Sequence, residues 1–170
     1  KGGETIRLAD AYCEKILDPE HDDDIPASAY PDNKTYPKGG KGIVSVFKIQ
    51  RDNYAWTVSD FKMQHPKQPV IYEMHLRDFT TGRTINSALQ KLDYLKDMGV
   101  DAIELMPVQE FDGNDSWGYN PCFFFALDKA YGTPKMYKDF IDACHRKGMA
   151  VILDVVYNHA TGNMPFARLY

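Results

Sequence analysis

The sequence lacks the features that would place it on a nucleic acid or at a membrane. Its 170 residues carry a formal net charge of −4, so no basic excess favours binding to a nucleic acid or an anionic membrane. No apolar run approaches the ~20 residues that a membrane-spanning helix needs. The start of the chain, at Lys1, has no apolar segment typical of a signal peptide. We therefore expect neither nucleic acid nor membrane as a partner, and the compartment stays open.

Cysteine is also scarce. Cys13, Cys122 and Cys144 are widely spaced, form no CxxC pair and are odd in number. We interpret them as packing thiols that belong to no metal site. The hydrophobic share of 44% and the charged share of 26% are typical of a globular domain.

The most informative stretch runs from Val151 to Val156 and is apolar except for Asp154. An uninterrupted apolar run predicts a strand buried on both faces, because a half-exposed strand would alternate apolar and polar residues. A buried carboxylate is costly unless it is paired or hydrogen-bonded. Asn158 and His159 follow where the strand should end. The alternative to a functional site here is a core strand with a capping turn.

A helix, a glycine and a buried strand recur 49 residues apart. The first helix is predicted to begin at Thr84 or Asn86 and to end before Gly99, and the second to begin at Thr133-Pro134 and to end before Gly148. With a strand at residues 70–75, this alternation predicts parallel strands near 70–75, 101–106 and 150–155, adjacent in that order. A doubly wound nucleotide fold would need a glycine-rich turn after its first strand. That turn is missing, so a (β/α)8 barrel is favoured.

Other segments predict less regular structure. Residues 5–9 and 42–49 are predicted strands, residues 54–59 a possible partner for the latter, and residues 11–17 one or two helical turns. Residues 18–42 are rich in proline and glycine, which predicts a long loop lying on a surface. Residues 110–131 are predicted to form a long aromatic loop.

Four motifs stand in a familiar order and spacing. They are Tyr72-Glu-Met-His-Leu-Arg-Asp-Phe79, Ala102-Ile-Glu-Leu-Met-Pro-Val108, Trp117-Gly-Tyr-Asn-Pro121 and Asp154-Val-Val-Tyr-Asn-His159. Together they resemble the α-amylase superfamily, glycoside hydrolase family 13, and the first looks most like the pullulanase and debranching side. The resemblance implies an α/β fold in which residues 70–170 form the first three strands of a (β/α)8 barrel. Residues 1–69 would then be the end of an N-terminal β domain and a linker.

The resemblance implies a glycosidase that acts on α-glucans such as pullulan, glycogen or starch, by α-1,6 debranching or α-1,4 hydrolysis with a retaining mechanism. In the family the catalytic carboxylates follow strands four, five and seven, so no catalytic residue is assigned here. Glu110, Asp112 and Asp115 are predicted to be solvated loop residues. We expect this fragment to be inactive alone and to self-associate through its open sheet. A branching transglycosylase and a non-catalytic glucan-binding fragment remain alternatives.

Substrate-binding positions carry over residue by residue. His159 is implied to donate a hydrogen bond to the sugar, and Tyr119 to form an aromatic platform beneath it. Asp154 is implied to support the site by bonding a basic neighbour, and Trp117 to border the cleft. Asn158 matches a position that binds calcium in many α-amylases; no cofactor is required, and one amide does not make a calcium site. Loop packing is the alternative for both aromatic residues.

Two further pairs of polar residues belong to the predicted strands. His75 and Arg77 close the first strand and are expected to make structural hydrogen bonds inside the barrel mouth. Glu73 and Glu104 interrupt their strands and are expected to be paired with neighbours.

Overall fold

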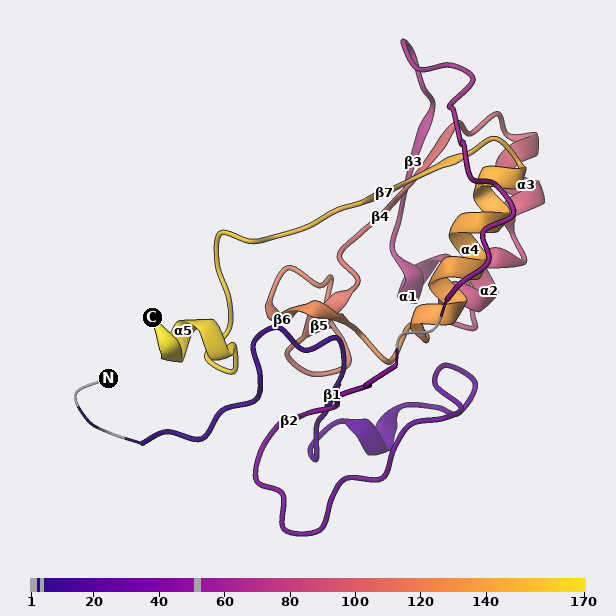
Figure 1. Ribbon diagram of the computed structural model, residues 1–170. Coiled ribbons are helices and arrows are strands. Elements are labelled where there is room, and N and C mark those ends of the chain that lie inside the picture. The colour runs from indigo at the N-terminus through magenta and orange to yellow at the C-terminus, as the bar shows by residue number, and fades with distance from the viewer. Residues whose placement is uncertain (1–2, 4, 51–52) are drawn as a thin grey trace.

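Three parallel strands form the centre of the computed structural model, which describes residues 3, 5–50 and 53–170. They are β3 (Ile71–Met74), β4 (Ala102–Leu105) and β7 (Ala150–Leu153), adjacent in the order β3-β4-β7 (Figure 1). Their register is regular: Met74 lies beside Leu105, and Leu105 beside Leu153. The predicted strands, their parallel direction and their order are confirmed.

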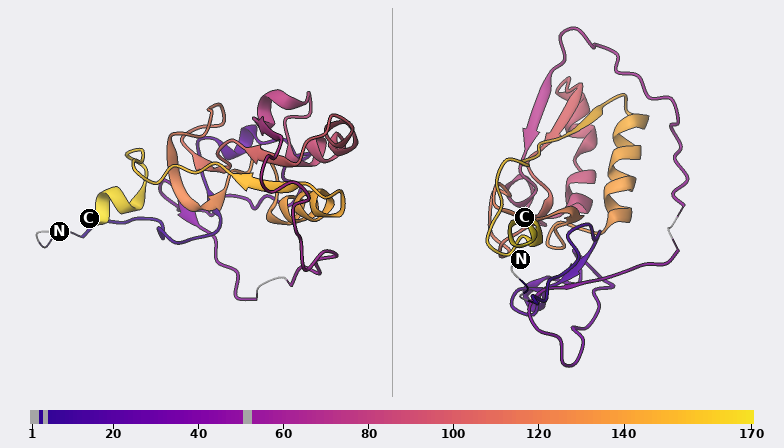
Figure 2. Two further views of the ribbon diagram at one scale, coloured as in Figure 1. Left: turned by 90° about the horizontal axis from the view of Figure 1, so that it is seen from above. Right: turned by 60° about the vertical axis from the view of Figure 1, so that its left-hand side comes forward.

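Helices cover one face of this sheet. Figures 1 and 2 show α2 (Ile85–Leu89), α3 (Leu92–Asp97) and α4 (Pro134–Arg146) on one side, while the described residues place no ribbon over the other. The main core fills the space between the sheet and these helices, with Met74, Ile103, Leu105, Leu95 and Phe140 among its buried side chains. Among the described residues, no helix is long and apolar enough to cross a membrane.

The predicted helix ends are mostly confirmed. Thr133 caps α4 by accepting a hydrogen bond from Met136 N, with Pro134 as its first residue. Thr84 and Ser87 form a reciprocal capping box at the start of α2. The helix expected to run to residue 98 is instead two helices, because Lys91 N bonds to Ala88 O, three residues back, and tightens the turn.

The expected loop at residues 110–131 is wrong in part. It contains an antiparallel hairpin of β5 (Gln109–Phe111) and β6 (Pro121–Leu127), joined by residues 112–120. Two register irregularities separate the three paired positions of β5, so the pairing follows no simple alternation in sequence. Short helices α1 (Leu76–Phe79) and α5 (Pro165–Leu169) complete the elements after β3.

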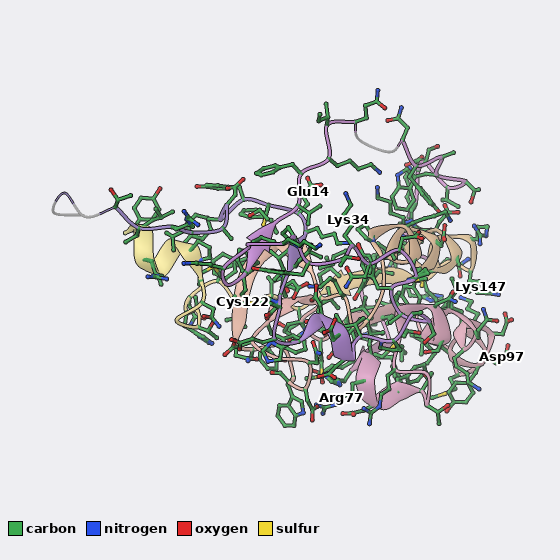
Figure 3. The ribbon with its side chains drawn as sticks, turned by 90° about the horizontal axis from the view of Figure 1, so that it is seen from below. Glu14, Lys34, Arg77, Asp97, Cys122 and Lys147 are labelled. Carbon is green, nitrogen blue, oxygen red and sulfur yellow. The ribbon has the colours of Figure 1, made fainter. Side chains whose placement is uncertain are left out.

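The N-terminal segment contains little regular structure. β1 (Ile16–Leu17) pairs antiparallel with β2 (Val44–Ser45), and the 3-10 turn η1 (Asp22–Asp24) lies between them. The strands expected at residues 5–9 and 54–59 and the helical turns expected at 11–17 are absent from the described residues. A second apolar cluster packs β1 against β6, and Cys122 lies there (Figure 3). The expected domain boundary after residue 69 stays a prediction. The N-terminal segment expected before it begins at Lys1, which lies outside the described residues.

Residues 53–65 run along α4 instead of forming a strand. Asp142 of α4 accepts hydrogen bonds from Thr57 N at 2.9 Å and from Thr57 Oγ1 at 2.7 Å. Phe61 stacks on His145, with ring centroids 4.2 Å apart. The backbone N–H groups of Thr57 and Val58 thus bond to a helix side chain, where a strand would bond to another strand.

The outer strands are more exposed than their sequences predicted. Only β4 is buried along most of its length, whereas Ile71 of β3 is 47% exposed and Leu153 of β7 is 50% exposed. The expectation that the stretch from Val151 is buried on both faces is therefore wrong for this chain. Its apolar residues lie on an outer strand, which has a neighbour on one side only among the described residues.

A buried charge cluster lies beneath the hairpin. Lys129, only 2% exposed, forms ion pairs with Glu110 and, at 3.3 Å, with Asp22. The prediction that Glu110 is a solvated loop residue is wrong, because it lies in β5 and is 5% exposed. Burial and nearby Asp128 raise the pKa of Glu110 to about 8, although Lys129 opposes them. Burial also raises the pKa of Asp128 to about 6. The ammonium of Lys129 thus lies among three carboxyl groups, and Lys15 also interacts electrostatically with Asp22 and Glu110.

This cluster predicts a stability that falls as the pH rises. The folded-state pKa of Glu110, about 8, lies above its ordinary value of 4.5, so the folded chain holds a proton that the unfolded chain releases. The midpoint of thermal unfolding should fall by a few degrees between pH 5 and pH 8, and Glu110→Gln should flatten this fall. Calorimetry at several pH values tests this, and equal slopes in both proteins would contradict it.

Candidate functional site

The residues that follow the three parallel strands share one edge of the sheet. β3 ends before His75 and β7 before Asp154, and their last residues lie side by side with that of β4. In parallel α/β folds, this carboxyl edge is where binding residues collect. Tyr119 reaches the same edge from the loop at residues 112–120, and its hydroxyl donates a hydrogen bond to Asp154 Oδ2 at 2.5 Å.

His159 completes this group. Its Nε2 donates to the backbone carbonyl of Tyr119 at 2.6 Å, 40 residues away in sequence. The structure thus brings together three of the predicted substrate-binding residues, Tyr119, Asp154 and His159. Tyr119 and Asp154 are half-buried, and His159 is exposed.

Negative charge surrounds the Tyr119 hydroxyl. Its hydrogen bond to Asp154 is the largest cause that raises the pKa of Tyr119 to about 12, followed by burial and by the charges of Asp154, Glu73 and Glu104. Glu73 and Glu104 are partners in the sheet register and so lie on one face. Neither has an ion pair among the described residues, so the pairing expected for them is not found there. The phenol stays protonated and is a permanent donor near neutral pH.

Among the described residues, the Tyr119 hydroxyl donates a hydrogen bond to Asp154. The basic neighbour that the resemblance implied for Asp154 is an arginine beyond this chain, so that pairing stays a prediction. A phenol donor supports a carboxylate by hydrogen bonding without adding charge.

Residues at the end of β3 hold the loop that carries Tyr119. The Nε2 of His75 donates to the carbonyl of Ser116 at 3.1 Å. Arg77 pairs with Asp115 in the same loop and with Asp78 at 2.9 Å. Hydrogen bonding to Asp78 and Asp115 raises the pKa of Arg77 above its ordinary range. These contacts are the structural hydrogen bonding that was expected for His75 and Arg77, and they fix the loop from one side.

The backbone of the loop needs glycine beside Tyr119. Gly118 has φ +87°, and a Cβ there would lie 2.6 Å from the backbone oxygen of Pro107, just after β4. The loop therefore approaches the end of β4 too closely for any side chain at this position.

Two predicted site residues lie apart from this group. Trp117 is 62% exposed and makes none of the ring contacts found among the described aromatic residues. Asn158 is exposed, and within residues 3, 5–50 and 53–170 no three His, Cys, Asp or Glu side chains gather as a metal cluster. The role of Asn158 as a calcium ligand stays a prediction.

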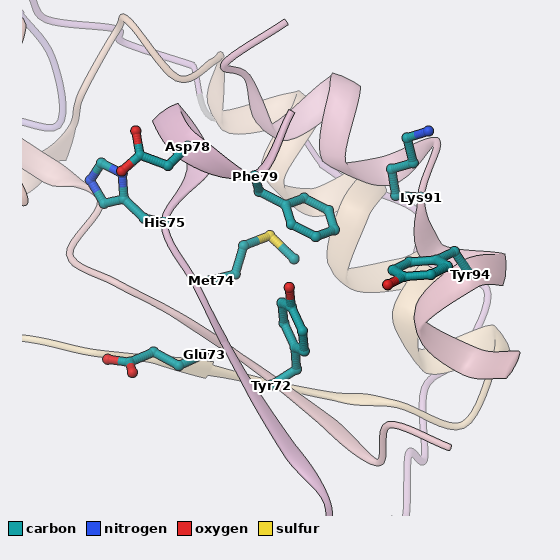
Figure 4. A pocket seen from close by; sticks show the side chains of 8 residues that line it. All are labelled: Tyr72, Glu73, Met74, His75, Asp78, Phe79, Lys91 and Tyr94. Carbon is teal, nitrogen blue, oxygen red and sulfur yellow. The ribbon is translucent and has the colours of Figure 1, made fainter. Parts of the chain in front are cut away.

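A separate hollow lies beside β3. It encloses about 580 Å³ and is lined by Tyr72, Phe79 and Tyr94 with five further residues (Figure 4). His75 and Asp78 lie at one end of it, but Tyr119, Asp154 and His159 are not among its lining residues. The hollow follows the outer side of β3, where the described residues supply no further strand.

Comparison with known proteins gives the family of the chain. Residues 71–168 match the family model "Alpha amylase, catalytic domain". The chain belongs to the α-amylase family. The matched residues include the three parallel strands and the Tyr119–Asp154–His159 group, so the resemblance that the four motifs suggested is confirmed.

Several α-amylase family relatives are similar over much of the chain. A malto-oligosyltrehalose trehalohydrolase of Arthrobacter ramosus is 41% identical over 77% of this chain and 22% of its own length. A pullulanase of Bacillus subtilis is 35% identical over 76% of this chain and 23% of its own. The product complex of the multi-modular glycogen-degrading pneumococcal virulence factor SpuA is 26% identical, with a TM-score of 0.66, over 94% of this chain and 19% of that one. The chain thus spans about a fifth to a quarter of these proteins.

The contact at Gly118 predicts a specific loss of stability. Gly118→Ala should destabilise the chain by roughly 2–5 kcal/mol, because the left-handed backbone costs ~1–2 kcal/mol and overpacking ~1–3 kcal/mol more. Gly113→Ala is the matched control, since Gly113 has φ +81° but nothing within 4 Å of an added Cβ. Chemical denaturation measures both, and an equal loss in the two variants would contradict the close approach to Pro107.

Proposed function

We propose that this chain is the first part of the catalytic barrel of an α-glucan hydrolase. The observation that carries the proposal is the convergence of Tyr119, Asp154 and His159 at the carboxyl edge of a parallel sheet in a chain of the α-amylase family. Trehalohydrolase and pullulanase relatives support a sugar polymer or oligomer as substrate.

Tyr119 is proposed to place its ring beneath a glucose unit. The hydroxyl at one end of the ring is held by Asp154, so the ring orientation is fixed before any sugar binds. An apolar pyranose face can stack on such a ring, and pre-organisation lowers the entropic cost of binding. Asp154 is therefore proposed to act through Tyr119, and Trp117 to border the cleft from the same loop.

His159 is proposed to bond a sugar hydroxyl through Nδ1. Its Nε2 already donates to the carbonyl of Tyr119, so that nitrogen is occupied. In a neutral imidazole with Nε2 protonated, Nδ1 is an acceptor, and a hydroxyl can donate to it. The hydrogen bond to the sugar that the family resemblance implied would then run in the opposite direction, from sugar to histidine.

The chemical step is proposed to need groups outside this chain. Glycoside hydrolysis requires two carboxyl groups about 5–9.5 Å apart across the scissile bond. Asp154 is engaged by Tyr119, and Glu110 is buried with Lys129, so neither is offered as acid or nucleophile. We propose a retaining mechanism carried out by later strands of a longer parent protein, and the chain alone should bind glucan without cleaving it.

Two hydrolytic specificities compete. The pullulanase relative favours α-1,6 debranching, whereas the trehalohydrolase relative favours malto-oligosyltrehalose. The alternative is a branching transglycosylase, which belongs to another reaction class. It would change the iodine staining of a glucan without releasing reducing ends.

We also propose that the isolated chain self-associates through the outer strands β3 and β7, which sedimentation velocity would detect.

His159 provides the test of this function. In the longer parent protein, His159→Ala should lower kcat/KM on the preferred glucan roughly ten- to a hundredfold, because a hydrogen bond is worth about 1–3 kcal/mol. His65→Ala is the matched control, since His65 bonds Asp101 beside the amino ends of β3 and β4. The measurements are reducing-sugar release from pullulan and amylopectin and trehalose release from malto-oligosyltrehalose.

Two outcomes would contradict the proposal. Turnover by the 170-residue chain itself, abolished by His159→Ala, would mean that catalytic groups lie within it. A parent protein that acts on none of these glucans would overturn the substrate class.

A further inference from the structure

The N-terminal loop at residues 18–42 has no role in the function proposed so far, yet it contacts the loop that carries Tyr119. The turn η1 and the residue before it make two contacts to the hairpin. Asp22 Oδ1 lies 3.3 Å from Lys129 Nζ, and the carbonyl of His21 accepts a hydrogen bond from Asn114 Nδ2 at 2.7 Å. These contacts join segments 107 and 93 residues apart in sequence (129 − 22 and 114 − 21).

The two contacts hold the hairpin at different points. Lys129 follows the end of β6, at the base of the hairpin, whereas Asn114 belongs to the connecting loop at 112–120. The Asp22 side chain is 11% exposed and Lys129 is 2% exposed, so this ion pair is shielded from water. His21 is itself held by Asp18, whose Oδ2 lies 2.8 Å from His21 Nδ1.

The same loop is held on two other sides. His75 and Arg77 hold it from the end of β3, and Asp154 and His159 hold it from the end of β7. The loop has no regular secondary structure of its own at residues 112–120. It has hydrogen bonds of its own, from Ser116 and Asn120, and Asn163 bonds to Asp112 at its start. Besides these, its position depends on the outside contacts, and His21, just before η1, supplies one from a third side.

We propose that Asp22 is a positioning residue for glucan binding: through Lys129, and together with the His21–Asn114 bond, it holds the loop at 112–120 so that Tyr119 stays against Asp154. The segment before the barrel is then part of the site and not a linker. The role of Asp22 in holding the loop follows from these contacts alone, whereas its role in glucan binding rests on the function proposed above.

Asp22→Asn removes the charge with little change in shape, and Asp23→Asn is its matched control. Asp23 belongs to the same turn and is exposed. In the 170-residue chain, amide hydrogen exchange of residues 112–120 should become about tenfold faster in Asp22→Asn and stay unchanged in Asp23→Asn. Exchange in α4 should change in neither variant. Asp22→Glu, which keeps the carboxylate, should restore most of the protection.

Two exchange results would overturn the proposal. Unchanged exchange at 112–120 in Asp22→Asn would show that the ion pair does not hold the loop. Equally faster exchange in α4 would show a general loss of stability instead of a local one.

Kinetics of the longer parent protein test the part that concerns glucan. Asp22→Asn should raise KM about five- to tenfold and leave kcat within about twofold, because a displaced platform weakens ground state and transition state alike. Asp23→Asn should change neither constant. Faster exchange with an unchanged KM would overturn the role in binding. A parent without activity on any glucan would instead contradict the proposed function, and the exchange results would still decide the role of Asp22 in holding the loop.

Discussion

The in-register parallel pairing of β3, β4 and β7 is the constraint on which the rest of the structure depends. Because Met74, Leu105 and Leu153 stand side by side, the chain leaves all three strands at one edge. The opposite edge is also fixed, since Asp101 accepts hydrogen bonds from Val70 N at 2.9 Å and from His65 at 2.8 Å. The bond from Val70, followed by that from His65, lowers the pKa of Asp101. The sheet thus defines where a site can form before any loop contributes to it.

The loop at residues 112–120 turns that edge into a specific site. A segment without regular structure loses conformational entropy when it is ordered, so its contacts must offset that cost. Polar contacts converge on this loop from residues just after β3, just after β7 and just before η1, and Gly118 lets the loop approach Pro107. The position of Tyr119 is therefore a property of the surrounding elements as much as of its own sequence.

Local signals explain what the sequence could predict. The strands and their order in the sheet could be predicted from the apolar runs, the Thr133 cap and the glycines expected to end two helices. The motifs predicted that Tyr119, Asp154 and His159 lie together. Long-range contacts explain what it could not. No local pattern indicates that Lys129 faces Glu110 or Asp22, and the irregular register of β5 and β6 hides the hairpin. Burial of the outer strands was overpredicted, because apolar sequence does not reveal how many neighbours a strand has.

Electrostatics at the sheet edge maintain the hydrogen bond between Tyr119 and Asp154. Glu73 and Glu104 lie on one face, and their charges, with that of Asp154, act on the Tyr119 hydroxyl. Arg77, just after β3, is paired with Asp78 and Asp115. The hydrogen bond to Asp154, burial and these negative charges all raise the pKa of Tyr119, because each disfavours the phenolate. The phenol therefore keeps its proton near neutral pH, and the loop at residues 112–120 stays joined to the end of β7 through this bond.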